Sequence, residues 1–318
     1  MKKLLILAAI LLAQSAMAQG LKQGTLSNVK RLTTGTEMYE NPRWSPDGTK
    51  IAFTRLGYDG LYIIDANGTA VTQISDDLGV GYQYQWSADS HEILVRDTRW
   101  ENNATGTMRL HAAWSIDMKG KKVRLSEDAE YMQPAAWRYS PVGEKSIMCV
   151  DAPAISGIKL KAVSTAVLQT VAKSVGSNIS FYVDGDNLYK ITARGTKVLI
   201  NQGPSFAPAL SPDGTKVAFN QMDDVCVMNI DGTGKKVIGA GYNASWVNNN
   251  QIVFERTTDD GHTYLTGELY MASIDGSNIK KLTSTADKIE MNPSVSPDGT
   301  KVVFTSFVDG QVYIADLK

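Results

Sequence analysis

Residues 44–53 have the sequence Trp-Ser-Pro-Asp-Gly-Thr-Lys-Ile-Ala-Phe, and nearly the same ten residues return at 210–219 and 295–304. The central Ser-Pro-Asp-Gly predicts a tight turn, because Pro presets φ at its position and Gly accepts the positive φ that closes the turn. The residues after Thr-Lys are rich in β-branched and aromatic side chains, which predicts a strand. The repeated unit is therefore a strand, a tight turn and a second strand.

Less regular copies of this unit begin at Trp86, Trp137 and Trp246, and a degenerate copy falls at 174–183. The seven copies follow one another at an average spacing of about 42 residues, which is the length of a four-stranded propeller blade. Asp-Gly and Asn-Gly pairs between short alternating segments, as at 59–60 and 67–68, predict hairpins. The sequence thus predicts an all-β fold, a closed β-propeller of four-stranded antiparallel blades.

The predicted number of blades is seven, with six as the alternative. The alternative follows from residues 159–183, which are the least regular part of the repeat. Their first half, 159–173, has a partly helical composition, but its valines and threonines fit two strands equally well. If this stretch contributes to one irregular blade rather than two, the count falls to six.

The two ends of the chain are complementary. The last copy ends without an outermost strand, and residues 29–33 (Val-Lys-Arg-Leu-Thr) match the outermost strand of an earlier copy at 280–283 (Lys-Lys-Leu-Thr). We therefore expect the N-terminal strand to pair with the last blade and close the ring. Closure removes the free sheet edges at which such arrays otherwise associate.

The first 18 residues have the features of a signal peptide. Two lysines at 2–3 precede an apolar run at 4–12, and Ala16-Met17-Ala18 forms a small-x-small cleavage site. We expect cleavage after Ala18, a periplasmic or secreted location, and a single propeller domain over 19–318. No later stretch approaches the 18 apolar residues of a membrane span, so we expect no membrane insertion. Cys149 and Cys226 lie two repeats apart in strand patterns, which predicts two unpaired, buried thiols.

The sequence offers little chemistry for catalysis. The formal net charge of −1 argues against a nucleic-acid partner. Gly-x-Ser-x-Gly is absent, and the three histidines, His91, His111 and His262, do not have the spacing of metal ligands. We therefore predict no catalytic residue, no metal and no cofactor. A carbohydrate-active or lyase-type enzyme with an axial site stays open as the alternative.

The repeat resembles the WD40-like propeller repeat of TolB-type periplasmic proteins, which also occurs in the propellers of prolyl oligopeptidase-like peptidases. The resemblance is carried by the ten-residue unit at 44–53 together with Leu-Tyr-Ile-Ile-Asp at 61–65, and it is strongest at 40–75, 208–237 and 268–316. It implies the fold and leaves the function open. Members of these families carry a further α/β domain, for which we expect no room here. We therefore expect an isolated propeller.

Candidate binding residues lie just upstream of each copy. Amides recur three residues before the first residue of a copy, and aromatic residues recur close by; both should border the central channel. Amides both donate and accept hydrogen bonds, and aromatic faces supply contact area, which suits a peptide or a glycan. Alternatively, these side chains satisfy backbone groups of neighbouring blades. The predicted set is Tyr39, Glu40, Asn41, Tyr82, Gln83, Tyr131, Gln133, Phe206, Tyr242, Asn243 and Asn292.

The insertion at 97–106 provides a second candidate surface, a contact loop formed by Arg99 and Trp100. Packing of Trp100 onto the adjoining blade is the alternative. The favoured function is a non-enzymatic, monomeric, exported propeller that binds a protein or peptide partner in the cell envelope. A purely structural module of a larger envelope assembly is a further hypothesis.

Overall fold

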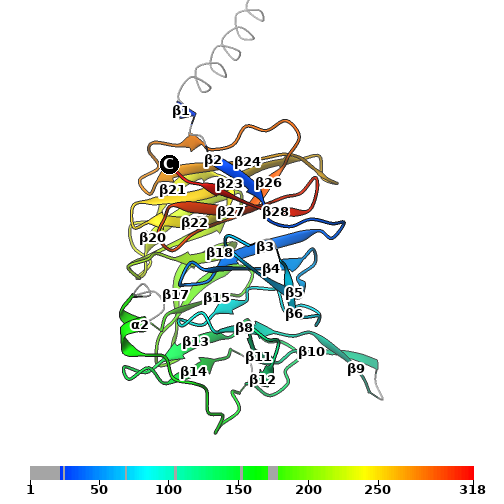
Figure 1. The fold of residues 1–318 in the computed structure, drawn as a ribbon. Helices are drawn as coiled ribbons and strands as arrows, with labels where there is room; N and C mark the ends of the chain where they lie inside the picture. The colour runs from blue at the N-terminus through cyan, green and yellow to red at the C-terminus, as the bar shows by residue number, and fades with distance from the viewer. Residues whose placement is uncertain (1–21, 24–25, 69, 104–105, 151–152, 171–177) are drawn as a thin grey trace, which may run out of the picture.

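The computed structural model describes residues 22–318 with the exception of 24–25, 69, 104–105, 151–152 and 171–177. The predicted signal peptide lies outside the described residues. Antiparallel sheets follow one another along the chain, and the red C-terminal strands lie beside the blue strand β2 (Figure 1). Within the described residues, no helix has the length and apolar character needed to cross a membrane.

Four sheets have the predicted four-stranded blade pattern in chain order, and a fifth completes it with an N-terminal strand. The first two contain β3 (Tyr39–Trp44), β4 (Lys50–Arg55), β5 (Asp59–Asp65) and β6 (Thr72–Ser75), then β7 (Gln85–Trp86), β8 (Glu92–Arg96), β11 (Ala113–Asp117) and β12 (Lys122–Arg124). The next two contain β18 (Ser205–Leu210), β19 (Lys216–Gln221), β20 (Asp224–Asn229) and β21 (Lys236–Ala240), then β22 (Tyr242–Asn248), β23 (Gln251–Asp259), β24 (Tyr264–Ser273) and β25 (Lys280–Lys281). The last contains β26 (Glu290–Val295), β27 (Lys301–Ser306), β28 (Gln311–Asp316) and β2 (Ser27–Arg31).

The prediction of seven blades is wrong, and the alternative of six is confirmed: the described residues contain six innermost strands, β3, β7, β13, β18, β22 and β26. The stretch expected to supply two blades forms two short sheets that share one blade position. These are β13 (Ala136–Tyr139) with β14 (Lys145–Met148), and β15 (Ser180–Val183) with β16 (Asn187–Ile191) and β17 (Lys197–Gln202).

Side chains of the degenerate copy bind the innermost strand of the copy before it. The Asn178 side chain donates to the carbonyl of Tyr139 and accepts from its N–H, both at 2.8 Å, as a paired strand would do. Arg138 donates to the hydroxyl of Ser180 at 3.1 Å. The irregular link includes a short helix, α2 (Thr165–Thr170), so the helical interpretation of 159–173 holds in part.

The Ser-Pro-Asp-Gly turns have the expected chemistry. Ser45 Oγ donates to Asp47 Oδ1 at 2.6 Å and accepts from the N–H of Lys50 at 2.9 Å, which closes the turn from both sides. Gly48 has a φ of 70°, which L-residues rarely adopt. The copies at 211–214 and 296–299 repeat these contacts. The residues that recur in these copies therefore serve to form the turns of the fold.

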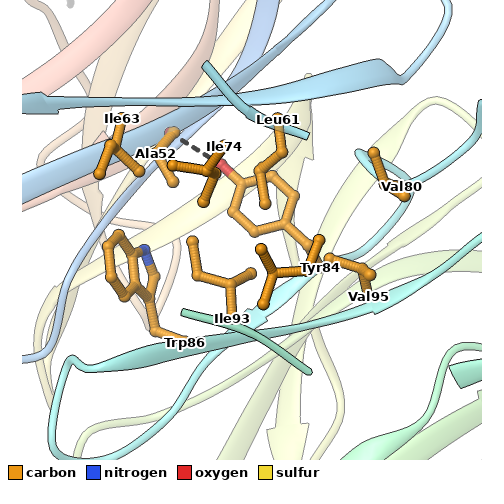
Figure 2. Packing of buried hydrophobic residues seen from close by; sticks show 10 residues of the cluster. Ala52, Leu61, Ile63, Ile74, Val80, Tyr84, Trp86, Ile93 and Val95 are labelled. Atoms are coloured by element: carbon orange, nitrogen blue, oxygen red, sulfur yellow. Dashed lines mark hydrogen bonds between the residues drawn. The ribbon is translucent and has the colours of Figure 1, made fainter. Parts of the chain in front are cut away.

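Each recurring Trp joins its blade to the one before it. The indole Nε1 donates to a carbonyl in the preceding innermost strand: Trp44 to Ser294, Trp86 to Arg43, Trp137 to Gln85, and Trp246 to Ala209. Around Trp86, apolar side chains of two adjacent blades form one core, in which the hydroxyl of Tyr84 donates to the carbonyl of Ala52 at 2.7 Å (Figure 2). These Trp residues therefore pack neighbouring blades together.

The N-terminal segment contacts two neighbouring blades. As expected, β2 pairs antiparallel with β28, with Lys30 opposite Ile314. Beyond the expectation, β1 (Lys22–Gln23) pairs parallel with β25 in the sheet before it. The two cysteines are unpaired, Cys226 buried and Cys149 half-buried.

Candidate functional site

The amide positions predicted from the repeat share an unusual backbone conformation. Asn41, Gln83, Ala207, Asn243 and Asn292 have φ between 48° and 56°, in the left-handed region. Asn enters this region more readily than most residues, which gives a backbone reason for its recurrence. In β3, β18, β22 and β26 the pairing register shifts across this position, as in a β-bulge, whereas Gln83 precedes β7. Each bulge changes the direction in which the side chains next to it point.

These bulges open into one cavity of about 370 Å³, here called the inner pocket. Four blades contribute to it: Phe206 alone comes from the blade of β18, and the other residues come from the blades of β3, β22 and β26. Its lining consists of Met38, Tyr39, Glu40, Leu56, Tyr58, Phe206, Tyr242, Asn243, Glu255, Thr257, Asp259, Tyr264, Met291, Asn292, Thr305, Phe307 and Gly310. A volume of this size is typical of small-ligand or side-chain sites.

A buried carboxyl group lies in this lining. Glu255, on β23, is only 2% exposed. The side-chain amide of Asn243 donates to its Oε1 at 2.9 Å, and the backbone N–H of Asn292 donates to its Oε2. Burial raises the pKa of Glu255 to about 7, although both hydrogen bonds favour the ionised form. A group that titrates near neutrality therefore lies in a pocket wall.

Aromatic pairs form much of the remaining wall. The rings of Phe206 and Tyr242 stack with centroids 6.3 Å apart, and those of Tyr264 and Phe307 meet edge to face at 5.2 Å. The Tyr242 hydroxyl donates to Asp223 Oδ1 at 2.6 Å, and this hydrogen bond, with burial, raises the pKa of Tyr242 to about 12. Phe206 is 41% exposed, so part of this wall faces solvent.

Glu40 fixes another part of the lining. Its Oε1 accepts the N–H groups of Gly57 and Tyr58 at 2.8 and 2.9 Å, which holds the β4–β5 turn over the pocket. Burial raises the pKa of the Glu40 carboxyl despite these two bonds. Tyr58 takes a φ of 64° there, a conformation rare for an aromatic residue.

The structure brings together six of the eleven predicted ring residues: Tyr39, Glu40, Phe206, Tyr242, Asn243 and Asn292 line the inner pocket. The other five lie outside it. Asn41 donates to the carbonyl of Gly81 in the next blade, as the structural alternative expects, and Tyr82 packs under the Arg96 guanidinium at 4.9 Å. Tyr131 is 79% exposed, Gln83 is exposed and Gln133 is half-buried.

The repeat contained a signal for Glu255 that the upstream positions did not show. Glu255 follows the Phe of its copy, where the three other copies that have this Phe continue with Thr54, Asn220 and Thr305. All four side chains are buried. The copy that begins at Trp86 has the half-buried Arg96 here, so the position is neutral and buried in three other copies, and a buried carboxyl group at it marks a site. Tyr264 and Phe307 lie in connections outside the repeated unit, so its alignment could not find them.

The predicted contact loop is the β-hairpin of β9 (Arg99–Asn103) and β10 (Gly106–Leu110), which projects from the β8–β11 sheet (Figure 1). Trp100 is 62% exposed on it. Arg99 pairs with Asp97 at 3.0 Å and with Asp128, beside a cleft of about 730 Å³. The lining of this acidic cleft thus includes a cation, Arg99, which already pairs with two of its carboxyl groups.

Catalytic groupings are scarce in the described part of the chain. It contains no cluster of three or more His, Cys, Asp or Glu side chains that could hold a metal. His111 is buried, and its Nδ1 lies 2.9 Å from the Asp97 carbonyl. Burial lowers the pKa of His111, which favours the neutral imidazole.

Comparisons with known proteins agree with the propeller. No family model matches the sequence. The curated TolB homolog of Chlorobium luteolum is 30% identical over 143 residues, which are 42% of this chain and 30% of that protein. The resemblance to TolB-type propellers is thus confirmed over part of the sequence, and the matched stretch spans less than a third of the relative's length.

Solved structures show the same fold along most of the chain. A candidate TolB from Agrobacterium tumefaciens has a TM-score of 0.52 at 16% identity and covers 93% of this chain and 100% of its own. The β-propeller domain of Cps50 (Swd1) from Myceliophteria thermophila has a TM-score of 0.58 at 14% identity, over 91% and 100% of the two chains. At these identities the likeness concerns the fold.

Proposed function

We propose that this protein is an exported propeller that binds a protein or peptide partner in the cell envelope through the inner pocket. The observation that carries the proposal is the convergence of four blades on one cavity that is lined by aromatic and polar side chains. Aromatic side chains combine large contact area with few rotatable bonds, so they favour binding of a partner side chain. The TolB resemblance and the signal-type N-terminal sequence support the envelope location.

One observation favours the enzyme alternative. A carboxyl group with a pKa of about 7 in a pocket is suited to general acid–base catalysis. Against this, amide groups of Asn243 and Asn292 occupy both oxygens of Glu255, and the lining contains no Lys, Arg, His or Cys. A binding role accounts for both the aromatic side chains and the buried carboxyl group of the pocket. A catalytic role accounts only for the raised pKa of Glu255.

The test is capture of partners by pocket variants. The purified protein, bearing an affinity tag, is cross-linked in an envelope extract and its partners are identified by mass spectrometry. The triple variant Phe206→Ala, Tyr242→Ala, Tyr264→Ala removes the half-exposed aromatic walls. Tyr131→Ala is the matched control, because it removes an exposed aromatic ring outside the pocket.

We expect a partner that the wild type and Tyr131→Ala capture equally and the triple variant loses. Thermal melting of each variant separates loss of binding from loss of folding. Equal capture of all partners by the folded triple variant would exclude the inner pocket as the binding site. The envelope location is tested separately, by fractionation of producing cells and by N-terminal sequencing, with Gln19 expected as the first residue.

A further inference from the structure

The charged residues that line the inner pocket are all acidic. Its lining includes the acidic residues Glu40, Glu255 and Asp259, and no Lys, Arg or His. A fourth carboxyl group, that of Asp223, holds the hydroxyl of Tyr242 at the rim. A concave surface with several carboxyl groups and low-dielectric walls concentrates a negative potential. The pocket is therefore complementary to a cation.

Two basic side chains near the pocket, those of Arg43 and Arg256, are engaged elsewhere. Arg43 donates to the carbonyl of Tyr84 at 3.0 Å and lies over the Tyr84 ring. Arg256, the residue after Glu255, donates to the carbonyl of Ala240 at 2.7 Å and lies over Tyr270. Neither belongs to the pocket lining.

Two other buried or partly buried acids have different partners from Glu255. Glu290, 1% exposed, accepts hydrogen bonds from the hydroxyls of Thr283 and Thr285 and does not line the inner pocket. Glu92, partly buried on β8, has a cation of its own, since the buried Lys145 ammonium lies 3.1 Å from its Oε2. The partners of Glu255 are amide N–H groups, which stabilise a carboxylate less than a cation does. An ionised carboxylate buried without a counter-charge is costly, and a ligand cation would relieve that cost.

We propose that the inner pocket accepts a basic side chain, lysine or arginine, of the bound partner. The proposal rests on the proposed function and names the chemistry that the pocket selects. The cationic head contacts Glu255 and Asp259, and the methylene stem lies against Phe206, Tyr242, Tyr264 and Phe307. Aromatic faces attract cations, so one wall serves both the stem and the charge.

Three small probes of matched length test this charge preference. They are the Nα-acetyl methylamides of lysine, arginine and norleucine, and the last lacks the charge. Each is titrated into the purified protein at pH 8, where Glu255 is ionised, and followed by ligand-detected NMR. We expect lysine or arginine to bind at least about tenfold more tightly than norleucine, with the preference falling as salt is added.

Variants locate the effect. Glu255→Gln and, separately, Asp259→Asn should reduce the preference for the charged probe to about threefold or less. Asp259 is exposed at the end of β23, so its variant keeps the assay interpretable if Glu255→Gln folds poorly. Glu101→Gln, which removes an exposed carboxyl group from the lining of the 730 Å³ cleft beside Arg99, should leave the preference unchanged.

The outcomes separate the two proposals. If norleucine binds as tightly as lysine and arginine, or if no probe binds saturably, the cation preference is wrong. If the preference persists in both pocket variants, the cation binds elsewhere and the proposal also fails. None of these results changes the interpretation of the partner-capture test, because that test depends on the aromatic side chains of the pocket. Conversely, capture that survives the triple aromatic variant overturns the proposed function even where the probes discriminate by charge.

Discussion

Replacing Glu255 should change how the stability of this protein depends on pH. Burial raises the pKa of Glu255 to about 7 in the folded protein, against an ordinary value of 4.5. The folded state therefore retains a proton that the unfolded chain has released between these two values. The stabilising contribution is complete below pH 4.5 and is lost as the pH rises through 7.

The size of the effect follows from the shift. Each pKa unit corresponds to about 1.4 kcal/mol, so the free energy of unfolding should lose about 3 kcal/mol through this group between pH 4.5 and pH 8. Glu255→Gln keeps the shape and removes the titration. Its amide oxygen can accept the N–H of Asn292, and the Asn243 side-chain amide can rotate to accept the new NH₂ group.

The assay is urea unfolding of both proteins at pH 5 and pH 8. The difference in unfolding free energy between variant and wild type cancels groups that titrate in both proteins, such as Glu40 and Glu290, whose pKa values burial also raises. Relative to wild type, the variant should gain about 2 to 3 kcal/mol between pH 5 and pH 8. Glu101→Gln, at an exposed position, should gain nothing. An equal difference at both pH values would refute a carboxyl group buried without a counter-charge.

Other predictions concern the scaffold. Deleting residues 21–34 removes β1, β2 and the buried Leu32 side chain, and should lower the melting temperature by about 10 °C or more in a calorimetric scan; an unchanged transition would show that this segment does not close the ring. Gly48→Ala should cost about 1 to 2 kcal/mol in urea unfolding because its φ is 70°, although the added methyl group has space. Trp246→Phe should cost about 1 kcal/mol or more through the lost hydrogen bond to the Ala209 carbonyl. Two thiols should react with Ellman's reagent in unfolded, unreduced protein, and a count of zero would contradict two free cysteines.

The fold class was predictable because its determinants are local. Ser45, Asp47 and Gly48 form their turn through contacts within six residues of chain, and the strands alternate with turns of similar chemistry. The recurring Trp was also interpretable, since one repeat position implies one structural role. The pairing of residues 29–33 with the last blade followed from sequence likeness between two outermost strands.

The number of blades required the tertiary structure. A degenerate copy can form a blade or join its neighbour, and the strand sequence alone is compatible with both. In the folded protein the Asn178 side chain binds both backbone groups of Tyr139, which joins the degenerate copy to the preceding innermost strand. This contact joins segments 39 residues apart, so it lies beyond any local pattern.

The sequence by itself therefore determined the repeated unit, its turns and the positions from which a binding surface could be built. The tertiary structure decided which of those positions meet. Asn243 and Asn292 converge on Glu255 from two blades, while Asn41, at the same repeat position, donates to a backbone carbonyl instead. The physical reason is that propensity acts on each segment separately, whereas the burial and charge of a pocket depend on side chains brought together only when the blades pack into the propeller.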